Sequence, residues 1–354
     1  MNRADRIEAL KAAAKERILV LDGSWGVMIQ RQGLSEADFR GERFADHPCQ
    51  LKGDNDILCL TRPDIIAGLH DAYFGAGADI SETNTFSATT IAQDDYQLDA
   101  KAVWDINLEG AKIAREAADR WTAKEPGKPR FVAGSIGPLN KMLSMSSDVN
   151  DPGARTVTFD QVYEAYRHQI AALHEGGVDL FLIETITDTL NCKAAIKAIL
   201  DLQDEGYEPL PIWISGTITD RSGRTLSGQT VEAFWNSVRH CKPFAVGLNC
   251  ALGAELMRPH IAELSRIADT LVAAYPNAGL PNAMGQYDEQ PHETACMLHE
   301  WADSGIVNIL GGCCGTTPEH IKHVADSVAG LKPRAVPERP TAMRLAGLEA
   351  FELA

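Results

Sequence analysis

The sequence predicts an α/β protein that folds as a (β/α)8 TIM barrel, a single domain with a linker-like C-terminal tail. Eight short apolar runs rich in Ile, Val, Leu and Phe recur along the chain, and each ends in small or polar residues. Amphipathic stretches long enough for helices lie between them. No G-x-G-x-x-G motif follows the first run, so a closed barrel of eight strands is favoured over a doubly wound open sheet.

The predicted strands are nearly continuous in apolar character, which is typical of parallel strands covered on both faces. Along the chain they span residues 18–23, 78–86, 131–138, 179–187, 211–219, 244–250, 270–277 and 307–315. Several of the amphipathic stretches end at a glycine, the usual helix stop. The clearest predicted helices span residues 63–78, 158–177, 189–206 and 291–305.

Two segments fall outside this alternation. Residues 34–63 carry many charges and few periodic apolar positions, so they are expected to form an inserted loop over one barrel end, acting as a lid or as filler. After about residue 330 the chain has three prolines and no further strand pattern. The sequence therefore predicts a barrel over residues 1–332 and a tail or linker over residues 333–354.

Composition narrows the class of partner and the compartment. Lys and Arg total 33 against 49 Asp and Glu, a formal charge of −16, so neither nucleic acid nor an anionic membrane is an expected partner. The first residues are charged throughout and contain no secretory signal. The longest uncharged stretch, residues 271–287, contains two prolines and cannot serve as a membrane span. A cytoplasmic location is expected, and with it reduced or metal-binding cysteines.

Three cysteines stand where predicted strands end. Cys250 ends the sixth strand, and Cys313 and Cys314 close the eighth. Active sites of such barrels form at the C-terminal ends of the strands, so these thiols are expected at one barrel mouth. Neighbouring residues of a regular strand point to opposite faces, so Cys313 and Cys314 can share one ion only where the backbone turns. The glycines around them permit such a turn.

Three thiolates leave one position open on a tetrahedral ion, which is typical of a catalytic zinc site. Soft sulfur ligands favour zinc over magnesium or calcium. Such an ion would activate a thiol substrate rather than water. Two other interpretations remain at this point: a strained disulfide between Cys313 and Cys314, or two small buried residues without a ligand.

Two carboxylates also stand at strand ends. Asp22 comes after the first strand and Glu184 lies within the fourth. A buried, unpaired carboxylate is costly, and a substrate ammonium group would compensate it. A helix N-cap or a solvated loop acid would explain each residue as well. Gly23 and Gly137 either offer backbone N–H groups to a substrate carboxylate or simply form tight turns.

Several motifs together resemble a known family. They read "DGSWG", "GADISETNTF", "LIETITDTLNCKAAI", "SGTITDRSGRTLSGQT", "VGLNCALG", "YPNAGLPN" and "GGCCGTTPEHI". This set is similar to the homocysteine-binding module of cobalamin-dependent methionine synthase, within the zinc-dependent homocysteine S-methyltransferase family. The resemblance runs from about residue 15 to the C-terminus.

The resemblance implies roles for particular residues. The zinc ligands would be Cys250, Cys313 and Cys314, with Asn277 as the fourth ligand when substrate is absent. The residues that hold the amino acid end of homocysteine, or line the same pocket, would be Asp22, Gly23, Glu184, Thr83 and Asn84. The chain departs from the family pattern at Ser24 and Trp25 and over residues 137–147.

The implied activity is methyl transfer from methylcobalamin to zinc-bound homocysteine thiolate, which forms methionine. The chain contains neither the D-x-H-x-x-G motif of a cobalamin module nor a folate-binding barrel. The donor is therefore expected on a separate cobalamin- and methyltetrahydrofolate-binding subunit, or on domains from which this chain was excised. Two alternatives stay open: methyl transfer from a small donor such as S-methylmethionine or betaine, and a homocysteine-binding subunit that is inactive alone.

Overall fold

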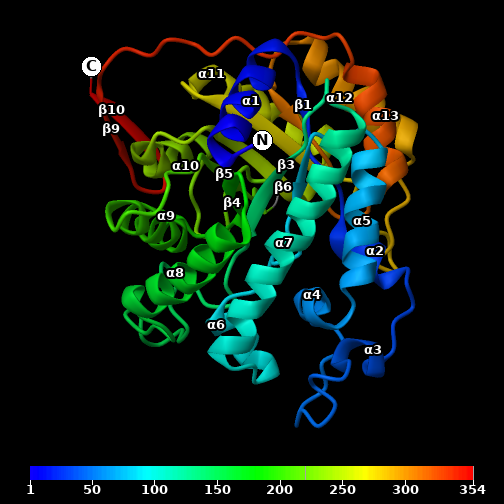
Figure 1. Ribbon diagram of the computed structural model, residues 1–354. Coiled ribbons are helices and arrows are strands. Elements are labelled where there is room, and N and C mark those ends of the chain that lie inside the picture. Colours follow the sequence, from blue (N-terminus) through cyan, green and yellow to red (C-terminus); the bar gives the residue numbers. More distant parts are fainter. Residues whose placement is uncertain (220, 354) are drawn as a thin grey trace.

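Eight parallel strands form a closed barrel surrounded by helices, which confirms the predicted fold class (Figure 1). The computed structural model describes residues 1–219 and 221–353. The strands pair in the order β1-β8-β7-β6-β5-β4-β3-β2, and a parallel bridge between Leu21 and Ile80 closes the seam between β1 and β2. The strands are β1 (Leu19–Val20), β2 (Ile80–Glu82), β3 (Phe131–Ile136), β4 (Leu180–Ile186), β5 (Ile212–Gly216), β6 (Ala245–Gly253), β7 (Leu271–Asn277) and β8 (Ile309–Leu310).

Helices cover the outer faces of these strands, and the four predicted ones are present as α5, α8, α9 and α12. The α-helices are α1 (Arg3–Glu16), α2 (Trp25–Gln30), α3 (Glu36–Arg40), α4 (Leu58–Thr61), α5 (Pro63–Gly75), α6 (Thr90–Gln93), α7 (Ala100–Lys124), α8 (Phe159–Gly176), α9 (Thr189–Asp204), α10 (Val231–Val238), α11 (Ala254–Ile267), α12 (Pro291–Asp303) and α13 (Pro318–Val328). Short 3₁₀ turns are η1 (Asn55–Ile57), η2 (Asp94–Tyr96) and η3 (Arg239–Cys241).

The first and last strands are shorter than predicted. Only Leu19–Val20 and Ile309–Leu310 form regular strand, against the predicted 18–23 and 307–315. Beyond Leu310 the backbone stays bonded to its neighbours, because the N–H groups of Gly311 and Cys313 donate to the carbonyls of Ala274 and Pro276 of β7. The N–H of Gly312 donates to the carbonyl of Asp22 at 3.0 Å. The residues after both strands are therefore held at the mouth of the barrel.

The barrel interior is a packed apolar core that is closed at the N-terminal end of the strands. Alternate strand residues such as Leu180, Leu182 and Trp213 point inward, as the two-residue period of a strand requires. Leu10 and Ala14 of α1 pack into the same cluster, and Figure 1 shows α1 lying over this end of the barrel. At the C-terminal end of the strands, polar residues take the inward positions that follow the apolar ones.

The inserted segment 34–63 is more ordered than the sequence suggested. It contains α3, η1 and α4, and its buried residues Phe39, Leu51 and Ile57 form one apolar cluster with α5 and α7. This order could not be predicted from sequence, because the apolar residues are spread over very short elements without a regular period. Figure 1 shows α3 and α4 at the end of the barrel opposite α1.

The C-terminal segment is attached to the barrel at two places. Arg334 is buried, and its guanidinium donates to the carbonyl oxygens of Ser265, Ala268 and Thr270. The chain then forms an antiparallel hairpin of β9 (Met343–Ala346) and β10 (Ala350–Leu353) beside α10, a feature the sequence did not predict (Figure 1). The division at residue 332 stays a prediction.

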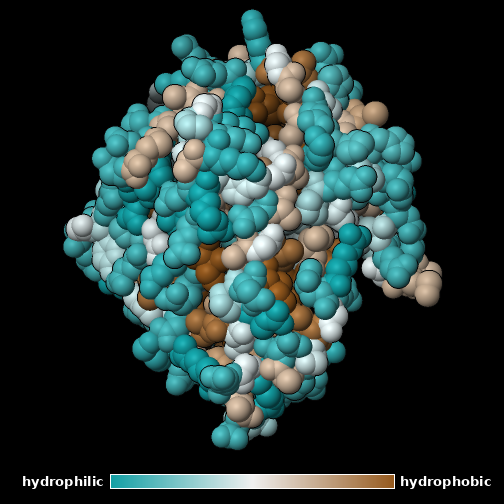
Figure 2. Space-filling model, turned by 45° about the vertical axis from the view of Figure 1, so that its right-hand side comes forward, coloured by the Kyte–Doolittle hydropathy of each residue, from teal (hydrophilic) through white to brown (hydrophobic). Residues whose placement is uncertain are grey.

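The surface fits the composition. The face shown in Figure 2 is mostly hydrophilic, with apolar side chains visible in recesses between the hydrophilic ones. Among the described residues, no helix is long and apolar enough to cross a membrane. All eight cysteines are free thiols, so the disulfide considered for Cys313 and Cys314 is absent.

Candidate active site

A cavity of about 480 Å³ opens at the C-terminal end of the barrel strands. Its walls come from the ends of β2, β3, β4, β6, β7 and β8, from the turn after β1, and from residues 53–56 of the inserted segment. Two acids on inward strand positions, Glu82 and Glu184, line it together with Asp54 and Asp56. Among the described residues that line it, none is Lys, Arg or His. The cavity therefore favours a ligand that carries positive charge.

The three thiols meet on the wall of this cavity. The Sγ atoms of Cys250, Cys313 and Cys314 all lie within 4.8 Å of one another, and those of Cys250 and Cys314 are 3.8 Å apart. Each side chain is half-buried. The structure thus brings together the three residues that the sequence placed at one barrel mouth, in a group compact enough to share one ion.

An irregularity in β6 directs Cys250 to this group. Between Asn249 and Gly253 the strand carries two more residues than β7 does opposite, between Tyr275 and Asn277. Cys250 has φ +60° and Ala251 φ +57°, a left-handed conformation that costs about 1–3 kcal/mol for a non-glycine residue. A regular strand would turn residue 250 to the face opposite Asn249, whereas this bulge re-aims it toward the other cysteines.

Gly315 allows the backbone to turn directly after Cys313 and Cys314. Its φ is +85°, and a Cβ there would lie 2.3 Å from the ring of Tyr287. The ring therefore packs directly on the backbone that follows Cys314. Glycine satisfies both needs, because it adopts positive φ at little cost and leaves room for the ring.

The thiols share their charge unequally. Hydrogen bonds from Cys250 and Cys313 lower the pKa of the Cys314 thiol to about 3. The pKa of Cys313 lies well above its ordinary value, because it donates to Cys250 and Cys314 and is buried. One thiolate is thus already favoured in the free protein, and a cation placed among the three sulfurs would favour the others.

Three carboxylates lie close together: Glu82 and Glu184 line the cavity, and Asp22 accepts the N–H of Glu82. Burial raises the pKa of Asp22 to about 7, although hydrogen bonds from Ser81, Glu82 N–H and Trp25 oppose the shift. Burial also raises the pKa of Glu184 to about 7, despite the hydrogen bond from Ser135. The pKa of Glu82 lies well above its ordinary value because of burial and of repulsion from Glu184 and Asp22. A cationic group bound here would stabilise their ionised forms.

A sequence profile of homocysteine S-methyltransferases matches residues 19–328, nearly the whole barrel. The chain belongs to the homocysteine S-methyltransferase family. The match spans all three cysteines, the acids Asp22, Glu82 and Glu184, and the inserted segment.

Solved structures of the homocysteine methyltransferase MmuM from Escherichia coli share the fold of this family member. The metallated form matches with a TM-score of 0.71 and 22% identity, over 90% of this chain and 99% of that one. The oxidized form gives a TM-score of 0.70 at 22% identity, over 90% and 97% of the two chains. At this level of identity the likeness shows a common barrel.

The other residues that the sequence singled out for this homocysteine S-methyltransferase also lie at the mouth. Gly23, Thr83 and Asn84 line the cavity. Thr83 Oγ1 accepts the N–H of Ser135 at 2.9 Å, and Asn84 Nδ2 donates to the carbonyl of Asn55 at 2.8 Å. Both side chains therefore hold the cavity wall and the inserted segment in place, and their contact with substrate stays a prediction.

Asn277 and Asp22 are engaged with the protein itself. Asn277 Oδ1 accepts the N–H of Cys314 at 3.1 Å, and this hydrogen bond holds the backbone of Cys314 in place. Asp22 Oδ2 accepts the three hydrogen bonds described above, while among the described residues its buried Oδ1 has no partner. A role of Asn277 as a fourth metal ligand stays a prediction.

Sequence reasoning missed part of this homocysteine S-methyltransferase site. Tyr287 and residues 53–56 line the cavity without having been proposed as site residues, and Glu82, expected with Thr83 and Asn84 at the end of the second strand, was given no role. The available signals were weak: Glu82 directly precedes Thr83, and Tyr287 follows the turn-rich stretch "NAGLPNAMGQ" after β7. The inserted segment carries its acids in "GDND", which reads equally well as a solvated turn.

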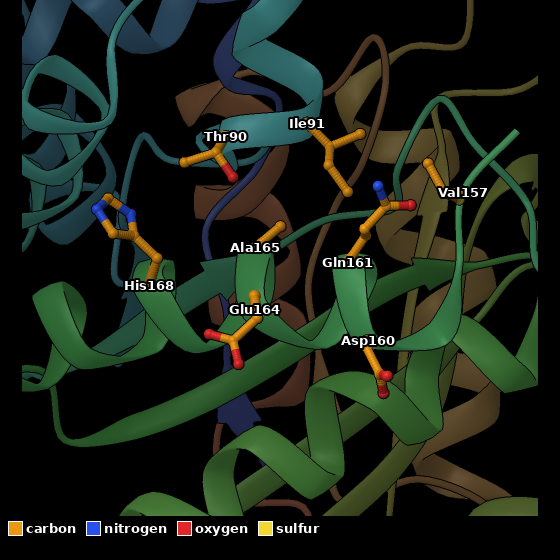
Figure 3. Close-up of a pocket in the computed structure, with 8 residues that line it drawn as sticks. All are labelled: Thr90, Ile91, Val157, Asp160, Gln161, Glu164, Ala165 and His168. Atoms are coloured by element: carbon orange, nitrogen blue, oxygen red, sulfur yellow. The ribbon is translucent and has the colours of Figure 1, made fainter.

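A second hollow lies on the outside of the barrel, between α6 and α8. Figure 3 shows Thr90 and Ile91 facing Gln161 and Ala165 across it. The hollow is open and contains no cysteine. It is separate from the thiols, so the mouth of the barrel remains the candidate active site.

Proposed function

We propose that this protein transfers a methyl group to the thiolate of homocysteine on a zinc ion held by Cys250, Cys313 and Cys314. The proposed donor is methylcobalamin, carried by a separate cobalamin- and methyltetrahydrofolate-binding chain or domain. The observation that carries the proposal is the group of three thiols within 4.8 Å on the wall of an acid-lined cavity.

The donor set fits zinc. Three soft sulfur ligands that face a cavity leave one position of a tetrahedral ion for an incoming group. When bound, zinc lowers the pKa of a substrate thiol and holds it as a thiolate. The low pKa of Cys314 means that the protein supplies part of the compensating negative charge before any ion arrives.

The acids provide the recognition of the amino acid. Glu184 and Glu82 line the same cavity as the thiols, so an ammonium group bound between them would leave the sulfur of homocysteine directed toward the three cysteines. Asp22 lies next to Glu82, whose N–H it accepts, and one of its carboxylate oxygens has no partner among the described residues. Holding the substrate at both ends restricts its sulfur to one direction of attack.

The proposed step balances without a general base in the protein. A zinc ion held by Cys250, Cys313 and Cys314 would lower the pKa of the substrate thiol, which would release its proton to solvent. The sulfur's electron pair would form the new S–CH3 bond with the methyl group of the donor, and the electron pair of the cobalt–carbon bond would stay on cobalt. The products would be methionine and cob(I)alamin. The protein contributes orientation, negative charge and a cavity that encloses the amino acid.

Exposed apolar residues at this end of the barrel support a macromolecular donor. Phe86 lines the cavity and is exposed, and Leu226, Leu280 and Met284 are exposed on the loops that follow β5 and β7. Exposed apolar side chains on the loops that surround an active-site end are typical of a surface that another protein covers.

One observation favours a second candidate, transfer from a small cationic donor such as S-methylmethionine or betaine. Four carboxylates line the cavity, and among the described lining residues there is no basic side chain. Homocysteine methylation should be assayed with each small donor while no cobalamin protein is present. Turnover with either one would replace methylcobalamin in the proposal and leave the zinc site unchanged.

The ligand assignment is tested with Cys314→Ala and the control Cys296→Ala, an exposed cysteine on α12. We expect Cys314→Ala to lose stoichiometric zinc and methyl transfer together, and Cys296→Ala to keep both. Zinc content is measured by atomic absorption, and methionine formation is measured from homocysteine and free methylcobalamin. A Cys314→Ala protein with full zinc and full turnover would contradict the assignment. Zinc-dependent turnover by the purified wild-type chain would rule out a subunit that only binds homocysteine.

A further inference from the structure

The residue before Cys250 connects the two ends of the site. Asn249 is fully buried on the inward face of β6. Its Oδ1 accepts the N–H of Thr185 at 3.1 Å and the hydroxyl of Ser215 at 2.7 Å. Its Nδ2 donates to Thr185 Oγ1 at 2.8 Å. One carboxamide thus bonds both the N–H and the hydroxyl of the residue that follows Glu184.

The orientation of this carboxamide is fixed by its partners. A backbone N–H only donates, so the atom that faces Thr185 N must be the oxygen. The nitrogen is then left on the side of Thr185 Oγ1 and of Cys313, whose Sγ lies 4.0 Å from it. An N–H group aimed toward a thiolate stabilises negative charge on the sulfur.

Asn249 lies beside backbone segments in which non-glycine residues have positive φ angles. Thr185 has φ +54°, within a register shift of β4 against β5. Cys250 and Ala251, directly after Asn249, have φ +60° and +57° within the register shift of β6. Non-glycine residues keep such conformations only where their surroundings hold them. The carboxamide contacts one irregular segment and is covalently joined to the other.

We propose that Asn249 is a positioning residue that sets the separation between Glu184 and the three thiols. The inference rests on the proposed function, because a substrate held by its ammonium at one end and its sulfur at the other requires that separation to be constant. Asn249 touches neither the substrate nor the ion in this scheme. It acts through Thr185 on the acid end and through Cys250 and Cys313 on the thiol end.

The test compares Asn249→Ala with Asn308→Ala. Asn308 is also buried and also bridges two segments, because it accepts the N–H of Val272 and donates to the carbonyl of Arg334. It lies just before β8, at the end of the barrel away from the thiols. Both variants lose a buried carboxamide, so both should lose thermal stability, and only Asn249→Ala should alter the site.

We expect Asn249→Ala to bind zinc about 10- to 100-fold more weakly, the usual effect of removing a residue that orients metal ligands. Zinc affinity is measured by competition with a chromophoric chelator. The thiolate-to-metal band of the cobalt(II)-substituted protein should also shift. Asn308→Ala should keep the zinc affinity and the cobalt spectrum of the wild type. Wild-type zinc affinity and spectrum in Asn249→Ala, or equal losses in Asn308→Ala, would overturn the proposal.

A second variant and a metal-free assay test the role of Asn249 independently. Thr185→Val removes only the hydroxyl partner, so it remains usable if Asn249→Ala fails to fold, and it should weaken zinc in the same direction. In metal-free protein, alkylation of Cys250 and Cys313 by iodoacetamide, followed by mass spectrometry, should change several-fold in Asn249→Ala and stay unchanged in Asn308→Ala. This readout uses neither metal nor donor, so it judges Asn249 even where the proposed function fails.

Discussion

Glu184 and Asp22, both buried, and the half-buried Glu82 form a group of acids without a basic partner among the described residues. Such a group is destabilising when ionised, so the free protein keeps much of it protonated near neutral pH. Because the pKa of Glu184 is raised to about 7 from an ordinary 4.5, the folded state binds more protons than the unfolded state between these values. Its contribution to stability is present below about pH 4.5 and is lost as pH rises toward 7.

Ligand binding should show the opposite pH dependence. Methionine carries the ammonium group and has no thiol proton to lose, so its affinity should rise as pH increases from 6 to 8 and Glu184 ionises. Glu184→Gln should weaken binding about 10- to 100-fold, as expected for a lost charged hydrogen bond, and should flatten the pH profile with zinc content unchanged. Calorimetric titration at several pH values measures both effects. Wild-type affinity and slope in the variant would contradict the assignment of Glu184.

Alanine substitutions at Gly315 and Gly330 distinguish the cost of the backbone conformation at positive φ from the cost of a steric clash of the added Cβ. Both have φ above +80°, but a Cβ at Gly315 would meet the Tyr287 ring, whereas a Cβ at Gly330 would meet nothing within 4 Å. Gly330→Ala should therefore cost only the backbone term, about 1–2 kcal/mol of the unfolding free energy. Gly315→Ala should cost more and should also weaken zinc binding. Urea denaturation and zinc competition provide the two measurements, and equal effects of both substitutions would argue against a role of Tyr287 packing at the thiols.

Single residues were predictable from sequence where their position along a strand decides their place. Cys250 and Glu184 end apolar runs, and a barrel brings such ends to one mouth. Tyr287 was not predictable in this way, because it comes from a long turn-rich connection whose path follows from tertiary packing. The bulge at Cys250 was also hidden, since nothing in "GLNCALG" other than its position signals a left-handed cysteine.

At the scale of elements, the strands and main helices followed from hydrophobic periodicity, and the irregular segments did not. The hairpin β9–β10 depends on contacts distant in sequence: Thr230 N–H donates to the carbonyl of Leu348, and Gln229 Nε2 donates to that of Gly347. Short strands of this kind have little signal of their own. The same holds for η1 and α4, whose burial depends on α5 and α7.

Truncation separates the two attachments of the C-terminal segment. A chain ending at Pro340 loses the hairpin and keeps Arg334, while a chain ending at Lys332 loses both. We expect the first to retain most of its unfolding free energy. The second should lose at least about 2 kcal/mol more, because the buried carbonyls of Ser265, Ala268 and Thr270 lose a charged donor. Denaturant midpoints measure the difference, and equal midpoints would show that Arg334 contributes little.

At the scale of the whole molecule, the proposed metal site is an addition to a fold that is already complete. The barrel interior, the layer between strands and helices and the inserted segment each have an extensive apolar core. Small metal-dependent domains lack such cores and unfold without their ion. This protein should therefore stay folded when the proposed zinc ion is absent.

Chelation provides the corresponding test. After treatment with a strong chelator, the circular dichroism spectrum should be unchanged and the melting temperature lower. Adding zinc back at 100 times its dissociation constant should stabilise the wild type by about 2.7 kcal/mol. Cys250→Ala should not respond to zinc. If the melting temperature of the wild type does not change when zinc is added, the three thiols do not form a metal site.

The seam between β1 and β2 is joined by one residue pair, Leu21 and Ile80, with an aspartate at each end. Asp79 accepts the N–H of Val20, and Asp22 accepts the N–H of Glu82. Carboxylates thus replace part of the hydrogen-bond ladder at the point where the barrel closes. The seam ends among the acids that are proposed to hold the substrate ammonium. We expect local opening of the ligand-free barrel to begin at this seam. A ligand bound to these acids would make that opening less frequent, so closure of the barrel and ligand binding would be thermodynamically linked.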